Sequence, residues 1–484
     1  MPARLRVLVG AVVCAGTYGL VLALGQTDAL HPRFGQLVLG LWVVCLVTTW
    51  WMRRHEFSWR KPVLVVMAVA ALVQLPGILL DPRSSSDAYR YVWDGRVQLS
   101  GTSPYRYAPL DDRLARLRDP VLFPGLGPRD RSGFTTAPLP TDRSALLALA
   151  RDDPRTRINR PRVPTIYPPV AQAWFTVVAA VTPWSLGTRG LQVGSAAIAV
   201  LLAGALALWR RRRGEDPLGA LWWACCPTVM IEAGNGGHVD IVAAALVVAG
   251  LWIFTTAAGR RVAVVGGGLL LGLAASVKLT PLVMLPAMAP LRGTGVLDRA
   301  RRALPAPAVA VATLAVSYLP HVFVAGALVL GYLPGYLAEE DDAGRAAVLG
   351  LLLPDAWLTP AIVVVMAVTV GWALWWVSRA AARREDAVLV ALVLFGVLLL
   401  ATTPNYPWYA LPLVALAVVN SRLEWLAVAV AAYLAYGATT SPPVAGFAYG
   451  SAGLVVVVVS LVRVRHPRRP FLRDAPHDAQ SVRP

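Results

Sequence analysis

The chain carries many uninterrupted apolar runs, each about 15 to 24 residues long and close to the roughly 20 residues that a helix needs to cross a bilayer. Backbone polar groups inside lipid must be satisfied internally, so such runs form helices. With 57% hydrophobic and 15% charged residues, the 484-residue chain is too apolar for a soluble globular protein. The sequence therefore predicts an all-α polytopic membrane protein. The first run, 6–25, lacks a small-residue cleavage site before a soluble domain, so we expect a retained membrane helix and not a signal peptide.

The distribution of charge predicts how these helices are oriented. The net charge of +18 comes from arginine clusters between apolar runs, as the positive-inside rule predicts for cytoplasmic loops, and this argues against a nucleic-acid partner. We therefore expect a plasma-membrane protein with both termini cytoplasmic. Among the 45 basic residues only Lys61 and Lys278 are lysines. The four cysteines show no metal-ligand spacing and are interpreted as small packing residues; they are Cys14, Cys45, Cys225 and Cys226.

The apolar runs divide the chain into four parts. Residues 1–81 are predicted to form three N-terminal membrane helices, and residues 82–187 an external loop with juxtamembrane or re-entrant helices. Residues 188–462 are expected to form the transmembrane core bundle, and 463–484 a basic, disordered cytoplasmic tail. We expect about 12–14 crossings, because some runs are short for a span and the run 167–183 suits a re-entrant or interfacial helix. The candidate crossings are 6–25, 35–52, 63–81, 188–209, 217–231, 239–256, 263–277, 281–291, 304–320, 355–378, 387–402, 407–419, 424–440 and 446–462.

Polar residues outside the arginine clusters gather on the predicted outer side. They occupy the ends of separate apolar runs, together with the acidic group 339–342. A transporter is expected to concentrate such groups near the bilayer midplane, often in broken helices. Groups at the outer rim instead favour chemistry on the head group of a lipid whose chain stays in the membrane. The stretches are 84–109, 232–240, 278–281, 320–321 and 402–409.

The stretch DAYRYVWDGR places Asp87, Arg90 and Asp94 at i, i+3 and i+7, on one face of a helix. An arginine can bind phosphate oxygens through two hydrogen bonds, and a neighbouring carboxylate can act as a base. Two simpler interpretations stay open. Asp87 could cap a solvated helix end, or Asp and Arg could form an ion pair without catalysis.

The stretches GHVD and VKLTP each allow two interpretations. His238 and Asp240 resemble half of a metal site, but no further His or Cys cluster supports a metal, so hydrogen-bonding roles are favoured. Lys278 suits either a membrane anchor that reaches toward the interface or a phosphate ligand.

The stretch PNYPWY is either an interfacial aromatic belt or a sugar-binding group, in which Asn405 bonds a sugar between the rings of Tyr406 and Trp408. The glycines of GGGLLLG lie inside an apolar run and indicate close helix packing. The chain shows neither a Walker motif nor a Ser-His-Asp signature, so the sequence indicates no direct use of a nucleotide.

Five blocks follow one another in the sequence: DAYRYVWDGRVQLSGTSPYRYAP, TIYPPVAQAWF, GNGGHVDIVAAALVVAG, ASVKLTPLVMLP and PNYPWYALPL. Together they resemble the GT-C glycosyltransferases of the actinobacterial type, the polyprenyl-phosphate-mannose-dependent α-mannosyltransferases that build lipoglycans. The resemblance implies a helical bundle whose first large external loop carries juxtamembrane helices over a lipid-facing cavity. The chain departs from that pattern in two ways. Three runs precede the loop, and no adjacent acidic pair lies near Asp87, because Asp111 and Asp112 come further along.

The resemblance also implies roles for single residues. The acidic residue just beyond a span, here Asp87, is the catalytic base, and the lysine of VKLTP, here Lys278, binds the donor phosphate; His321 and His238 are helpers by position. Together with the arguments above, the expected phosphate ligands are Arg90, Arg96, Lys278 and His321. The expected sugar- or acceptor-binding residues are Trp93, Asp94, Tyr167, His238, Asp240, Asn405, Tyr406 and Trp408. No metal site is expected.

The expected function is the inverting transfer of a sugar, mannose by the resemblance, from a polyprenyl-phosphate donor to an envelope glycolipid or polysaccharide on the outer face. The expected partners are membrane lipids, this donor and a glycan acceptor, with no other cofactor. Two other classes stay open: a lipid or small-molecule transporter or flippase that makes no bond, and a non-catalytic subunit of an envelope-synthesis complex. The long aromatic loop and the one-sided charge argue against the transporter.

Overall fold

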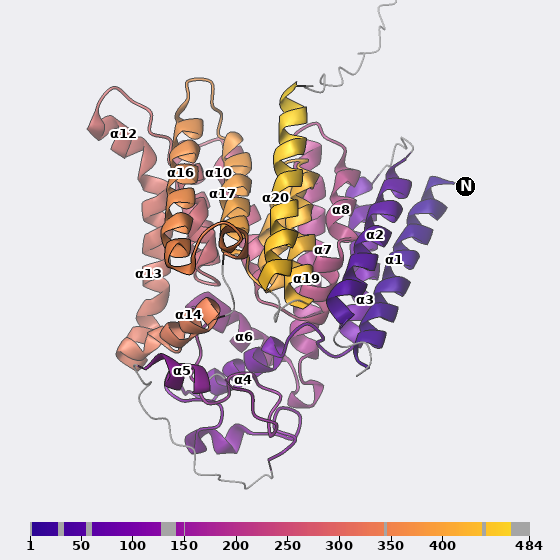
Figure 1. The fold of residues 1–484 in the computed structure, drawn as a ribbon, viewed down its shortest axis with the longest axis vertical. Coiled ribbons are helices and arrows are strands. Elements are labelled where there is room, and N and C mark those ends of the chain that lie inside the picture. Colours follow the sequence, from indigo (N-terminus) through magenta and orange to yellow (C-terminus); the bar gives the residue numbers. More distant parts are fainter. Residues whose placement is uncertain are drawn as a thin grey trace, which may run out of the picture.

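The computed structural model describes residues 2–27, 33–54, 61–126, 142–149, 151–342, 346–437 and 442–465. These residues form helices and loops, with no strand among them, as expected for an all-α protein. Long helices stand side by side in a bundle, and a layer of shorter helices and loops covers one end of it (Figure 1). Most of the predicted tail, 466–484, and the loop segment 127–141 lie outside the described residues.

Seven described helical segments are long and apolar enough to cross a membrane, which confirms the polytopic prediction. An eighth is added if the pair Pro227–Asn235 and Asp240–Thr256, bent by 118°, counts as one broken span. The seven are α1 (Ala3–Gly25), α2 (Phe34–Arg53), α3 (Pro62–Leu79), α7 (Arg189–Arg212), Pro305–Glu339 with α13 (Pro305–Ala325), Asp355–Ser378 with α16 (Leu358–Ser378), and Pro443–Arg465 in α20 (Pro442–Arg465).

The other candidate crossings form shorter elements. The run 217–231 breaks into single turns and a π-helix, and the run 281–291 is a 3-10 helix, Thr280–Met288, too short to span alone. The remaining elements are α8 (Leu221–Ala224), α9 (Pro227–Val229), η5 (Met230–Asn235), α10 (Asp240–Thr256), α11 (Arg260–Ala275), α12 (Val296–Ala303), α14 (Leu333–Asp342), α15 (Ala347–Gly350), α17 (Asp386–Thr402), η9 (Pro407–Ala410), α18 (Leu411–Val419) and α19 (Leu426–Gly437).

The layer is built on two short helices, α4 (Asp87–Leu99) and α6 (Pro169–Val181). The ring of Tyr91 stacks on that of Phe175, with centroids 4.4 Å apart, and Gly95 lets the two backbones approach closely. Two prolines, Pro168 and Pro169, start α6, which is only 13 residues long, so it packs under the bundle without crossing it. The layer also contains η2 (Asp112–Leu117) and α5 (Arg143–Leu149).

The first and the last described helix reach the same end of the bundle. The start of α1 and the Arg465 end of α20 lie at the end opposite the layer (Figure 1). The arginine-rich last turn of α7, at Arg210, and the basic helix α12 lie at that same opposite end. The described ends of α1 and α20, the last turn of α7 and helix α12 thus share one end of the bundle, and the described part of the loop 82–187, which carries arginines of its own, covers the other.

Candidate active site

A cavity of about 430 Å³ lies where the layer meets the bundle. Its polar wall comes from the start of α4 and a loop of the layer, and its apolar wall comes from α17, from α14 and from the segment that precedes α14. Such a cavity suits a ligand with a charged head and an apolar chain. The lining residues are Ser85, Asp87, Tyr91, Asn159, Arg160, Ile166, Tyr167, Pro168, Val277, Lys278, Leu279, Thr280, Tyr318, Val329, Leu330, Leu333, Tyr336, Leu337, Leu398, Leu399, Thr402, Pro404, Tyr406, Trp408 and Tyr409.

Asp87 starts α4, where the partial positive charge of a helix N-terminus favours a carboxylate. Its Oδ1 accepts a hydrogen bond from the Asn159 amide nitrogen at 2.5 Å, and its Oδ2 accepts one from the Tyr91 hydroxyl at 3.4 Å. Burial raises the pKa of Tyr91 well above its ordinary value, so the phenol keeps its proton and acts as a donor. The side chain of Asp87 is nevertheless 11% exposed and faces the cavity. It is therefore placed to receive a proton from a bound hydroxyl group.

Two cations face the same cavity. The Lys278 ammonium donates to Asp240 Oδ1 at 2.7 Å and lies 3.4 Å from the centroid of the Tyr409 ring. The Arg160 guanidinium donates to both carboxylate oxygens of Glu339, with Nη2 2.5 Å from Oε2. Both cations are thus held in defined orientations at the cavity wall, where a phosphate group would be bound by charge-assisted hydrogen bonds.

Five of the sequence-predicted residues line the cavity, and two others lie directly behind it. Asp240 holds Lys278, and His238 lies with its Nε2 3.9 Å from Asp87 Oδ2. Asn405 stands between the lining residues Pro404 and Tyr406 and does not itself line the cavity. The five lining residues are Asp87, Tyr167, Lys278, Tyr406 and Trp408.

Arg90, Asp94 and Trp93 are buried inside the layer and do not line the cavity. Arg90 donates to Asp94 Oδ1 at 2.9 Å and to the backbone carbonyl groups of Arg160 and Val163, both at 3.2 Å. The predicted ion pair is therefore present, and it fixes the loop that carries Arg160. Trp93 packs against a phenylalanine ring of the layer.

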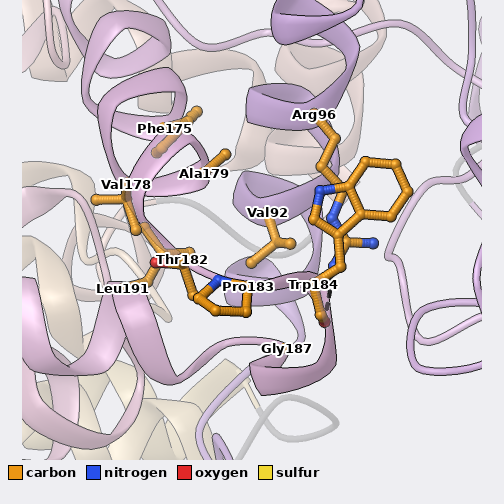
Figure 2. A pocket seen from close by; sticks show the side chains of 10 residues that line it. All are labelled: Val92, Arg96, Phe175, Val178, Ala179, Thr182, Pro183, Trp184, Gly187 and Leu191. Carbon is orange, nitrogen blue, oxygen red and sulfur yellow. Dashed lines mark hydrogen bonds between the residues drawn. The ribbon is translucent and has the colours of Figure 1, made fainter.

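Arg96 and His321 lie away from the cavity. Arg96 is paired with Asp119, donates to the Trp184 carbonyl oxygen at 3.1 Å and lies 4.5 Å from the centroid of the Trp184 ring. Figure 2 shows Arg96 and Trp184 side by side at a pocket of only about 10 Å³, too small for a phosphate ester. His321, on α13, meets the Tyr105 ring edge to face, with centroids 5.2 Å apart. In this structure both side chains hold the layer together and neither meets the cavity.

Several residues at the cavity were not predicted from the sequence. Asn159 and Arg160 lie in the arginine-rich external loop, at RDDPRTRINRPR, with Asn159 72 residues beyond Asp87. The sequence suggests that this loop holds the acceptor glycan or its anionic anchor but singles out neither residue. Tyr336 follows an apolar run without a motif. Tyr409 and Glu232, by contrast, belong to stretches that the sequence did single out, PNYPWY and EAGNGGHVD.

A comparison with known protein families found one similarity. Residues 161–293 match the family model described as alpha-(1->6)-mannopyranosyltransferase, N-terminal domain. The matched segment contains Tyr167, His238, Asp240 and Lys278. No curated protein and no solved structure matches the chain. The part of the chain that forms one wall of the cavity is therefore similar to a mannosyltransferase family.

Proposed function

We propose that this chain is a membrane mannosyltransferase that moves a mannosyl group from a polyprenyl-phosphate donor to an envelope glycolipid or polysaccharide. One observation carries the proposal. A single cavity combines the Asp87 carboxylate, the cations Lys278 and Arg160 and a wall of leucines, and one side of it comes from the segment that matches the mannosyltransferase family. The leucines suit a lipid chain, the cations suit its phosphate, and the carboxylate suits a base.

The proposed reaction is a single displacement. Asp87 takes the proton of an acceptor hydroxyl group, whose oxygen forms a bond to the anomeric carbon of the mannose. The bond from that carbon to the phosphate oxygen breaks on the opposite face, and its electron pair leaves with polyprenyl phosphate. Lys278 and Arg160 stabilise the charge that develops on the phosphate. The configuration is inverted, which converts a β-linked donor into an α-linked product.

The aromatic residues would select the sugar and the acceptor. Tyr406 and Trp408 stack on each other, with centroids 4.9 Å apart, and both face the cavity. Because Trp408 also stacks on His238, Tyr406 is the ring that would pack against the apolar face of a sugar. The cavity lies at the end of the bundle opposite the start of α1, the end of α20 and the basic helix α12, and the predicted topology places that end on the outer face of the plasma membrane.

The test is transfer of radiolabelled mannose from polyprenyl-phosphate mannose to membrane glycolipid acceptors by the full-length protein in nanodiscs, with and without EDTA. Asp87→Asn keeps the shape of the side chain and removes the base, so we expect it to lower the rate by at least about 10²-fold. Asp111→Asn is the matched control, because Asp111 is a buried aspartate of the same layer that bonds Arg113 away from the cavity.

Transfer by the wild type and by Asp111→Asn, but not by Asp87→Asn, would support the proposal. Equal transfer by the two variants would remove Asp87 as the base. If the wild type transfers no sugar from any polyprenyl-phosphate donor, the proposed function is wrong, and a flipping assay with the same donors would test the transporter alternative.

A further inference from the structure

A buried carboxylate lies behind the cavity and has no role in the reaction described so far. Glu232 is fully buried in the short π-helix η5. Its Oε1 accepts a hydrogen bond from the Tyr433 hydroxyl at 2.5 Å, and its Oε2 accepts one from the Ser84 hydroxyl at 2.9 Å. A buried charge is costly unless it is paired, and the nearest group able to carry a positive charge is the imidazole ring of His238, with Nδ1 3.1 Å from Oε2.

The hydrogen bonds of His238 determine where its proton lies. Nδ1 lies 3.1 Å from the Glu232 carboxylate and 3.1 Å from the Glu232 carbonyl oxygen. Both of these oxygens can only accept a hydrogen bond, so Nδ1 carries a hydrogen and donates it. Nε2 then has its lone pair directed at the Ser85 hydroxyl, 2.9 Å away, with Asp87 Oδ2 at 3.9 Å. Ser85 also accepts a hydrogen bond from the Asp87 backbone nitrogen at 3.1 Å. The ring thus links a buried carboxylate to the carboxylate in the cavity.

The local fold holds this ring in place. A Cβ atom on Gly236 would lie 2.5 Å from His238 Nδ1, so only glycine lets the chain pass the ring this closely. On its other side the ring stacks on Trp408, with centroids 4.0 Å apart and planes 12° apart. An indole face stabilises a cation above it, so the same contact favours the ring when it is protonated. A π-helical turn, an element that often marks functional sites, places Glu232 beneath the ring.

We propose that Glu232 and His238 form a proton-accepting pair behind Asp87; the inference rests on the proposed transfer reaction. Asp87 takes the proton from the acceptor hydroxyl group as the glycosidic bond forms. The Asp87 side chain, two residues from Ser85, turns to bring its carboxyl proton to Ser85 Oγ, and Ser85 passes its own proton to His238 Nε2. The imidazolium that results is stabilised by Glu232, and Asp87 is again a carboxylate. When the product leaves, the stored proton returns by way of Ser85 to the cavity and passes to water, which resets the pair for the next turnover. Glu232 fixes the tautomer that makes this possible and touches no substrate.

The pair predicts a specific pH dependence. His238 must be neutral before it can accept a proton, and imidazole titrates near neutral pH. The charged and titratable groups around it are Glu232 from η5, Asp87 from α4, Asp240 from α10 with its partner Lys278, and Tyr433 from α19. The acid limb of the wild-type kcat profile should therefore follow the imidazole. In His238→Gln the rate is lower, and this limb no longer appears at that pH.

The experiment measures kcat, the KM for donor and the pH profile of transfer for the full-length protein in nanodiscs. Expected results are a fall in kcat of about 10²-fold in Glu232→Gln, His238→Gln and Ser85→Ala, with little change in KM for the donor. Glu232→Asp, which keeps the charge, should recover part of the rate. Glu424→Gln is the matched control, a buried carboxylate bound to Arg463 at the other end of the bundle, and should keep the wild-type profile.

The Ser85→Ala variant separates a loss of proton transfer from a loss of folding, because it removes one hydroxyl group and leaves the buried ion pair intact. If Glu232→Gln, His238→Gln and Ser85→Ala transfer mannose at the wild-type rate, or more slowly with an unchanged pH profile, the pair has no part in proton transfer and the inference is wrong. That outcome differs from failure of the proposed function, in which the wild type itself transfers no sugar.

Discussion

The ammonium nitrogen of Lys278, in the turn between α11 and the 3-10 helix Thr280–Met288, lies 2.7 Å from Oδ1 of Asp240, the first residue of α10. The contact joins two of the stretches that the sequence singled out, GHVD and VKLTP, into one part of the site. It also fixes a flexible side chain that would otherwise lose considerable rotamer freedom on binding a phosphate.

Replacement of this lysine should weaken donor binding. Lys278→Met keeps most of the length of the side chain and removes its charge. A hydrogen bond to a charged group contributes about 1.5–3 kcal/mol, so we expect the KM for the polyprenyl-phosphate donor to rise by roughly 10- to 150-fold. Steady-state transfer at varied donor concentration measures this, with Arg302→Met, an exposed cation on α12, as the control. An unchanged KM would show that Lys278 does not bind the phosphate.

A second carboxylate beside Asp87 should shift activity to higher pH. The Asn159 amide nitrogen lies 2.5 Å from Asp87 Oδ1, so Asn159→Asp places two carboxyl groups at a distance where they share a proton. The base is then occupied at pH values where the wild type is active, and the rate recovers only as the pH rises. Asn159→Ala removes the hydrogen bond without adding charge and should lower the rate without moving the acid limb. Identical pH profiles for the two variants would contradict this geometry.

The close approach of α4 and α6 should tolerate no side chain at Gly95. A Cβ atom there would lie 2.4 Å from the carbonyl oxygen of Phe175, which is backbone and cannot turn aside. We expect Gly95→Ala to lower the free energy of unfolding by about 1–3 kcal/mol, as overpacking typically does. Gly16→Ala, on a helix face with no atom near the added Cβ, should have no such cost. Thermal unfolding in detergent compares the two; equal midpoints would show that the helices can separate without penalty.

An ion-pair cluster should make the layer sensitive to acid. The side-chain hydrogen bonds of Arg155, with further attraction from Arg162, lower the pKa of Asp153 to about 2, although burial opposes them. An unfolded aspartate titrates near about 3.9, so this stabilisation is fully present above that pH and is lost as the pH falls toward 2. Hydrogen exchange of residues 151–163 between pH 5 and 2.5 measures the loss. Asp153→Asn should lack that component, and the same pH dependence in the variant would contradict it.

Two parts of the site could be predicted from the sequence because the signal was local. The spacing of Asp87, Arg90 and Asp94 does place them on one helix, and PNYPWY does bring its rings to the cavity. The role of each residue within a motif could not be predicted from the sequence. Arg90 lies on the same helix as Asp87, yet it turns into the layer and bonds the loop at Arg160, because nothing in a helical spacing says which face is covered.

The sequence by itself determined the class of this protein, because long apolar runs can satisfy their backbones in lipid only as helices, and its arginine clusters predict an orientation in the membrane. Only the tertiary structure decided which helices are bent or too short to span, and which polar groups meet. Asp87 meets Asn159 across 72 residues, Glu339 meets Arg160 across 179, and Tyr433 meets Glu232 across 201. Contacts at such separations leave no periodic trace in a sequence, since they follow from how whole helices pack against one another.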